Sequence, residues 1–155
     1  MNAAERQFFG FMAGGQAAYV PLDDVREIVR GLPFAPVSGG QRGVCGMVNL
    51  RGHVLTAIAP QRIWACTDMA TTPPLCGQDR LNMIVAHAGT FYSFLIDRCG
   101  DVDTVLDTDI EPLTPQSGIW QEIAGGICAR NGLAVPLLDM PRLLGYVEQG
   151  IAHRE

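Results

Sequence analysis

The sequence predicts an all-β fold of two small β-barrels, and three observations support this prediction. The chain has 155 residues, of which 48% are hydrophobic, so it can bury a sizeable core as one ordinary domain or as two small fused barrels. Eighteen glycines and ten prolines are spread among short apolar runs, which favours many turns over long helices. One strand–turn–strand pattern occurs twice, at residues 43–64 and again at residues 126–144.

Each copy of this repeat reads as a strand, a two-residue turn that contains glycine, a second apolar strand and a short helical exit. Arg51-Gly52 in the first copy aligns with Asn131-Gly132 in the second. Asn-Gly between apolar runs is a strong hairpin signal, because both residues adopt a positive φ at little cost. The strands before the turns align when residues 43–45 are matched to 126–128, with a three-residue difference in length. A duplicated β-module without catalytic residues between its copies suggests a scaffold that binds proteins.

Ten strands are expected along the chain, in two sets of five. The first set lies near residues 7–13, 16–22, 25–30, 44–50 and 53–58, and a short helical piece follows at 60–65. Residues 67–80 form a polar connector with adjacent prolines. The second set lies near residues 81–88, 91–97, 101–107, 125–130 and 133–138. These sets predict a first barrel over about 14–66 and a second over about 81–147, which the strand at 7–13 can also join.

Helical structure is expected only in short segments. Asp139 can act as the N-cap of a helix over about 140–147, and residues 148–155 are expected to fray. The loop at 108–124 has room for one helical turn. In the first copy of the repeat Ala59 replaces the capping aspartate, so the helical piece that follows is expected to be weaker.

Charge and cysteine usage exclude several classes of protein. The formal net charge is −5 and the pI is about 5.1, which argues against a nucleic-acid-binding protein because such a protein needs a basic face. The five cysteines are odd in number and lack the spacing of a zinc site, so they are expected to be reduced thiols rather than disulfides. No segment approaches the roughly 20 apolar residues that a membrane span needs. We therefore expect a cytoplasmic protein that does not insert into a membrane.

The sequence offers no set of residues for catalysis. His53, His87 and His153 are scattered, and no serine or cysteine nucleophile accompanies them at a recognisable turn. The acidic stretch at 101–109 lacks the glycine and the terminal glutamate of a calcium loop, so a solvated strand face is expected there. No metal or cofactor is therefore expected. The best enzymatic alternative is a small split-barrel flavin-binding oxidoreductase, although the chain lacks a basic cluster for the flavin phosphate.

Several short motifs arrive in an order that identifies a family. They are Tyr19-Val20-Pro21-Leu22, Val25-Arg26-Glu27-Ile28-Val29, Pro33-Phe34, Pro36, Gly46-Met47-Val48-Asn49-Leu50-Arg51-Gly52 and Val135-Pro136-Leu137-Leu138-Asp139. Together they resemble the CheW family, the coupling adaptors of bacterial chemotaxis arrays. The resemblance runs over about residues 7–144, nearly the whole chain, and the second and fifth motifs are specific only in combination.

The resemblance implies a single CheW-like domain over residues 1–155, made of two intertwined five-stranded SH3-like barrels around a shared apolar seam, with no catalysis. Members of the family bridge the regulatory domain of a CheA-type histidine kinase to the cytoplasmic tip of chemoreceptors, and barrel-to-barrel pairing can close into rings. The expected partners are therefore this kinase domain, the receptor tip and, in rings, a second copy. A stand-alone adaptor is expected, because the chain ends soon after the second barrel. The same scaffold could instead serve surface motility or a second-messenger pathway.

Six of the matching positions are candidates for binding these partners: Val25, Glu27, Ile28, Asn49, Arg51 and Gly52. If residues 25–30 form a regular strand, Glu27 shares a face with Val25 and Val29, and a carboxylate on an apolar face needs a partner. Arg51 can supply one through its planar guanidinium. The resemblance associates both positions with coupling, while a local ion pair that orients the turn remains the alternative. Gly52 is expected to shape the turn.

A trough for a receptor helix is a further expectation near the seam. An amphipathic helix binds in an apolar groove, and methionine adapts well to such a surface. The alternative is that these side chains are ordinary core. The residues of the expected trough are Val25, Ile28, Val44, Met47 and Val48.

Overall fold

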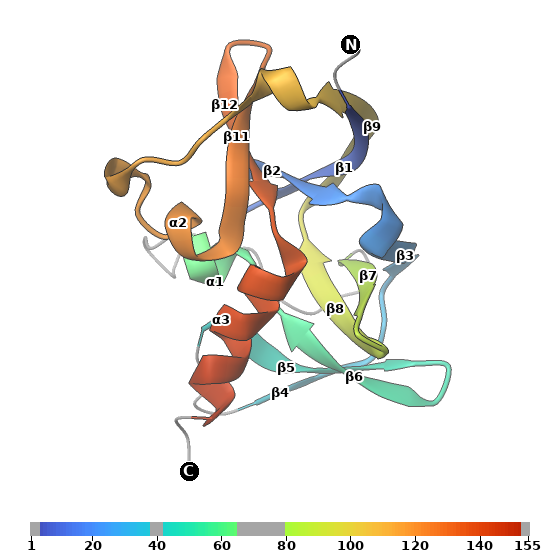
Figure 1. Ribbon diagram of the computed structural model, residues 1–155. Helices are drawn as coiled ribbons and strands as arrows, with labels where there is room; N and C mark the ends of the chain where they lie inside the picture. The colour runs from blue at the N-terminus through green and yellow to red at the C-terminus, as the bar shows by residue number, and fades with distance from the viewer. Residues whose placement is uncertain (1–3, 38–41, 65–79, 153–155) are drawn as a thin grey trace.

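A computed structural model describes residues 4–37, 42–64 and 80–152, which form two six-stranded sheets (Figure 1). Sheet 1 contains, in spatial order, β3 (Val25–Arg30), β7 (Leu81–His87), β8 (Thr90–Ile96), β6 (His53–Ile58), β5 (Val44–Leu50) and β4 (Phe34–Pro36). Sheet 2 contains β10 (Ile110–Glu111), β11 (Ala124–Arg130), β12 (Leu133–Leu138), β2 (Gln16–Pro21), β1 (Glu5–Ala13) and β9 (Arg98–Leu106). The helices are α1 (Gln61–Trp64), α2 (Trp120–Ile123) and α3 (Met140–Ala152), and 3-10 turns cover Leu22–Asp24, Asp107–Asp109 and Pro115–Ser117.

The predicted all-β fold is confirmed, and each of the ten expected strands is present. Each sheet contains five of the expected strands and one additional short strand, β4 or β10, that was not expected. These strands contain three and two residues, too few for an alternating pattern to be visible in the sequence. The connector expected at 67–80 lies outside the described residues except at its last position.

The sheets group the strands differently from the expected ranges of 14–66 and 81–147. Hairpin β1–β2 pairs with β9 and β12, whereas hairpin β7–β8 pairs with β3 and β6. Each half of the chain therefore supplies a hairpin that completes the sheet of the other half, and Figure 1 shows β7 and β8 beside β6 while β1, β2 and β9 lie together. Alternation marks which face of a strand is buried but does not say which sheet the strand joins. The halves are intertwined through this exchange.

Strand register corrects the alignment of the two repeat copies. Gly46 pairs with Ala57 after a bulge, and Gly126 pairs with Leu137 after a bulge at the same place. Residues 46–52 and 126–132 are therefore equivalent without a length difference, and the expected match of 43–45 to 126–128 is wrong. Each glycine lies against a short edge strand, Gly46 against β4 and Gly126 against β10. A Cβ on Gly46 would lie 2.3 Å from the carbonyl oxygen of Ala35, and one on Gly126 would lie 2.5 Å from Ile110 Cγ2.

Within the described ranges, three apolar clusters form the core. The largest joins both sheets and α3, with Phe11 and Val20 from sheet 2 packed together with Phe94 and Ile96 from sheet 1. Each sheet also encloses its own cluster. The cluster of sheet 1 contains Cys45, Val48, Leu55, Ala57, Ala59, Ile84 and Leu95, and that of sheet 2 contains Phe8, Tyr19, Val105, Cys128, Val135 and Leu137.

α3 is longer than expected. Its backbone reaches Ala152, so the expectation of fraying is wrong for residues 148–152, while residues 153–155 lie outside the described residues. The Tyr92 hydroxyl lies 3.2 Å from Glu148 Oε1 and ties the outer part of the helix to sheet 1. Asp139 acts as the expected N-cap, accepting a long 3.4 Å hydrogen bond from the Arg142 amide.

Across the part of the chain described, no helix is long and apolar enough to cross a membrane.

Candidate partner-binding site

A bulge in β3 decides which way the candidate side chains point. Val25 pairs with Val85, but Glu27 pairs with the adjacent Ile84, so Arg26 is the extra residue. Val25 and Ile28 consequently pack against the largest cluster, the shared core that joins both sheets. Glu27 instead lies opposite Ile84, which belongs to the sheet 1 cluster. The expectation that Val25 and Glu27 share a face is wrong, because it assumed a regular strand.

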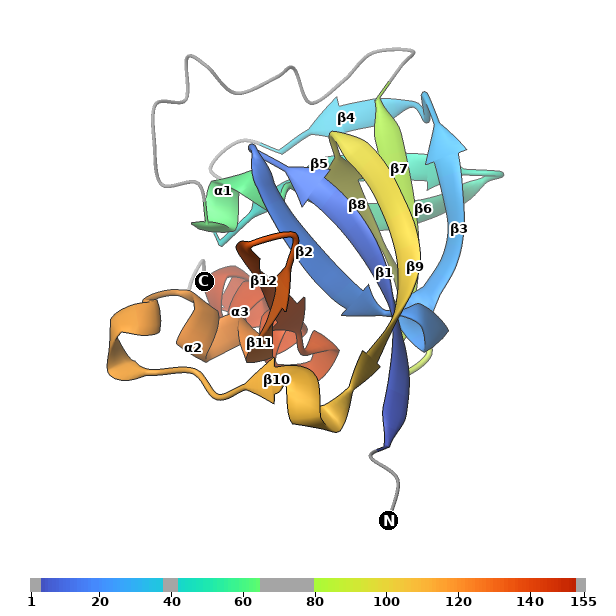
Figure 2. The same cartoon turned by 90° about the horizontal axis from the view of Figure 1, so that it is seen from above.

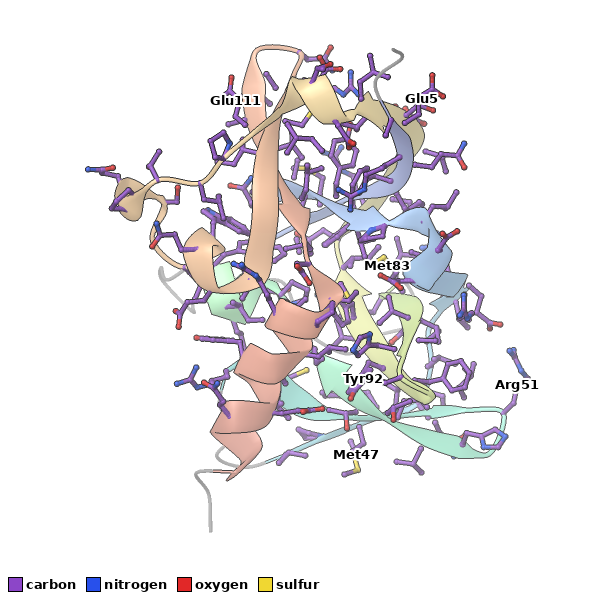
Figure 3. All side chains as sticks on the ribbon, in the orientation of Figure 1. Glu5, Met47, Arg51, Met83, Tyr92 and Glu111 are labelled. Atoms are coloured by element: carbon purple, nitrogen blue, oxygen red, sulfur yellow. The ribbon has the colours of Figure 1, made fainter. Side chains whose placement is uncertain are left out.

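The β5–β6 turn presents Arg51 at its tip. Arg51 and Gly52 have φ values of 49° and 90°, as a two-residue hairpin turn with both residues in the left-handed region requires. Asn49 Oδ1 accepts a 2.8 Å hydrogen bond from the Gly52 amide and stabilises this turn. A positive φ costs arginine some free energy, and the Asn49 hydrogen bond and Gly52 offset this cost by stabilising the turn. Asn49 and Gly52 therefore act by holding the turn in the shape that presents Arg51. Figure 3 shows the Arg51 side chain projecting from the end of the hairpin.

Arg51 and Glu27 form the ion pair expected from the sequence. Arg51 Nη2 lies 2.7 Å from Glu27 Oε1 and 2.8 Å from Oε2. The side chain of Arg51 is 67% exposed and that of Glu27 is 36% exposed. A pair this open to solvent contributes only about 0–1 kcal/mol to stability. The pair therefore fixes two charges at the surface more than it stabilises the fold.

A groove of about 550 Å³ lies beside the ion pair, between β3 and the β5–β6 and β7–β8 hairpins. Leu55 and Ile84 are buried below it, while Val54 and Phe91 are 65% and 47% exposed. Its charged rim and apolar interior match the anatomy of a protein interface. We call it the coupling groove, and its lining residues are Arg26, Glu27, Leu50, Arg51, His53, Val54, Leu55, Ile84 and Phe91.

Val54 and Phe91 line the coupling groove but are not among the six candidate residues predicted from the sequence. The signal for Val54 was available, because it alternates with Leu55 directly after the turn and so lies on the outer face of β6. For Phe91 there was no comparable signal, since it reaches the groove only because the β7–β8 hairpin joins sheet 1.

The structure does not bring the expected receptor-helix trough together. Val44 and Val48 are 6% and 2% exposed and belong to the core, while Met47 is 47% exposed on the other face of β5. Val25 and Ile28 are partly buried against the shared core. These five residues therefore do not line one open surface.

The equivalent region of sheet 2 has different chemistry. Its groove is about 180 Å³ and includes Asp101, Arg130, Asn131 and Leu133, at positions matching Glu27, Leu50, Arg51 and His53 of the coupling groove. Beneath it the Tyr19 hydroxyl donates a hydrogen bond to Asp103, and Arg130 Nη2 donates one of 2.9 Å to the Thr104 carbonyl. The two copies of the module have thus diverged at equivalent sites.

Tyr19 and Asp103 qualify the expectation of a solvated acidic stretch. Asp101, Asp107 and Asp109 are exposed as expected, but Asp103 is half-buried against the tyrosine. Burial, followed by the hydrogen bond to Asp103, raises the pKa of Tyr19 to about 12.

Among the described residues no cluster of three or more histidine, cysteine or acidic side chains is arranged to hold a metal ion.

Comparison with known proteins gives consistent matches. The family model of the CheW-like domain matches residues 7–148. The "Chemotaxis protein CheW" of Rhizobium meliloti is 31% identical over 150 residues, which are 95% of this chain and 92% of that protein. The protein of the same description from Helicobacter pylori is 25% identical over 143 residues, covering 92% and 84%. The crystal structure of the scaffolding protein TtCheW from Thermoanaerobacter tengcongensis superposes with a TM-score of 0.73 at 18% identity, covering 88% of this chain and 90% of that one, and so shares the fold.

Proposed function

The chain belongs to the family of CheW-like domains, and from this premise we propose that it couples chemoreceptors to a CheA-type histidine kinase. Membership supports a role as a chemotaxis adaptor, and it excludes the flavin oxidoreductase because the family is non-catalytic. The match of the family model over residues 7–148 is the observation that carries the proposal. The partners proposed are the kinase regulatory domain, the cytoplasmic tip of a receptor and, in rings, a second copy of the chain.

The coupling groove is the proposed contact with the kinase regulatory domain. Its Glu27–Arg51 pair is too exposed to be needed for folding, yet the turn holds Arg51 in place through the Asn49 bond. Val54 and Phe91 present apolar area next to these charges, which suits an apolar anchor from the partner surrounded by a polar rim. Of the six candidate residues, Glu27 and Arg51 would touch the partner, whereas Asn49 and Gly52 shape the turn and Val25 and Ile28 support β3 from the core side.

Calorimetry with the isolated kinase regulatory domain tests this function. The adaptor should bind in the micromolar range, about −8 kcal/mol. Val54→Asp should weaken binding at least tenfold, because it places a carboxylate in the apolar part of the groove. Leu133→Asp is the matched control, since Leu133 is 64% exposed on the equivalent hairpin of sheet 2 and should leave binding unchanged. Absence of binding by the folded wild-type chain to every kinase regulatory domain of its own cell would refute the proposed function.

A further inference from the structure

The N-terminal hairpin makes its sheet contacts with distant parts of the chain. β1 pairs with β9 over residues 5–12, and β2 pairs with β12 through Tyr19 and Leu137. The chain then leaves sheet 2 and enters sheet 1 at β3, which pairs with β7. Figure 2 shows β1 and β2 beside β9, with the chain turning away into β3 at the edge of the molecule. The hairpin is thus bound to sheet 2 but connected covalently to sheet 1.

A single 3-10 turn, Leu22–Asp24, makes that connection, and no residue in it is buried. The residues on either side are already extended, with φ and ψ of −54° and 131° at Pro21 and −86° and 129° at Val25. Two hydrogen bonds close the turn, from the Val25 amide to the Leu22 carbonyl and from Arg26 Nη1 to the Asp23 carbonyl at 2.7 Å. Only three residues must change conformation for β2 and β3 to run on as one extended segment.

The equivalent junction in the second half of the chain has no helical turn. By strand register Tyr19 is equivalent to Ser93 and Val25 to Cys99, so Asp23 corresponds to Asp97. There β8 ends at Ile96 and β9 begins at Arg98, with only a bend at Asp97 between them. The repeated module therefore folds without a helical turn at this point.

We propose that the N-terminal hairpin, residues 5–21, can leave the sheet of its own chain and complete sheet 2 of a second copy, giving a hairpin-exchanged dimer. The second copy offers the same strand pairs and the same pockets for Phe8, Phe11 and Val20, so the buried interface is unchanged. Only the Leu22–Asp24 hinge differs between the closed and exchanged forms, and concentration shifts the balance between them. Each dimer carries two coupling grooves, which makes it a bivalent form of the adaptor.

Shortening the hinge tests the exchange in the full chain. Deleting Asp23 and Asp24 joins Leu22 to Val25 and removes the turn, so it should favour β2 and β3 running on as one extended segment. The length-matched control is Asp23→Gly with Asp24→Gly, which keeps the turn long enough to close. Gln7 and Thr104 are exposed partners across β1 and β9, so cysteines at both positions, with the native cysteines replaced by alanine, record which chains pair.

Light scattering gives the mass, and non-reducing gels show whether the disulfide between positions 7 and 104 lies within or between chains. The shortened chain should be a discrete dimer of twice the mass with interchain disulfides, and the Gly–Gly chain a monomer with an intrachain disulfide. Refolding the Gly–Gly chain at rising concentration should increase its interchain fraction. A folded monomeric shortened chain with an intrachain disulfide would overturn the proposal. So would a shortened chain that forms neither disulfide while the control forms its own, because exchange keeps this interface intact.

Discussion

Replacing Arg51 by asparagine should separate the shape of the β5–β6 turn from the charge it carries. Asn131 occupies the equivalent position in the second copy of the module, with a φ of 52° against 49° for Arg51. Asparagine tolerates this left-handed conformation better than arginine. Arg51→Asn should therefore leave the free energy of unfolding within about 0.5 kcal/mol of the wild-type value, despite the loss of the ion pair. It should nevertheless weaken kinase binding.

The exposure of the pair sets the size of these effects. With Arg51 67% and Glu27 36% exposed, Coulomb energy at contact is near the aqueous limit of about 1 kcal/mol, and the net stabilisation is smaller. In the complex the partner excludes water from the groove, so loss of one charge should cost about 2 kcal/mol, or roughly 30-fold in Kd. Charge reversal by Arg51→Glu or Glu27→Lys should reduce the binding free energy by a similar amount. The double reversal should recover part of that binding free energy.

Denaturant unfolding followed by circular dichroism measures the stability term, and calorimetry with the kinase regulatory domain measures the binding term. Unfolding of Arg51→Asn at a markedly lower denaturant concentration would show that the charge is structural and would refute the prediction. Wild-type binding by all three single variants would refute it equally, because the pair would then be only a local contact that orients the turn. Strictly additive losses in the double reversal would show that Glu27 and Arg51 contact different groups of the partner.

Three further outcomes follow from the packing and the pKa of buried groups. Gly46→Ala should destabilise the fold by about 2–4 kcal/mol in denaturant unfolding, because its Cβ meets the Ala35 backbone. Gly125→Ala, whose Cβ would have no neighbour nearer than 3.9 Å, should be tolerated, and equal losses would contradict the assigned bulge. The pKa of Tyr19 is raised from its ordinary value of 10.0 to about 12, so its neutral form stabilises the fold. This stabilisation is complete below pH 10 and is lost as the pH rises towards 12. Ultraviolet titration should show one phenol ionising near pH 12. Asp139→Ala should cost about 1 kcal/mol in thermal unfolding through loss of the α3 cap, and an unchanged melting temperature would exclude that role.

Local patterns were sufficient to predict the strands but not their arrangement. Alternation and Gly-containing turns located β5, β6, β11 and β12, because those signals arise from neighbouring residues. The exchange of hairpins between sheets depends on contacts far apart in sequence, which periodicity does not report. The strands β4 and β10 were missed because each is too short to show a period.

The candidate site was predictable where chemistry alone determined it. A carboxylate at Glu27 and a guanidinium at Arg51 suggested an ion pair, and the structure has one. The face of Val25 was predicted wrongly because the bulge at Arg26 inverts the alternation. Phe91 was missed because it enters the coupling groove from a hairpin that belongs, along the chain, to the other half.

NMR chemical-shift changes on the labelled adaptor show which surface binds the kinase regulatory domain. On adding this domain, the largest changes should occur at residues 50–55 and at Glu27, Ile84 and Phe91, which surround the coupling groove. Residues 131–135 on the equivalent hairpin should change little. Two results would contradict the assignment of the coupling groove as the contact. One is changes confined to the second hairpin, and the other is saturated binding without changes at either hairpin.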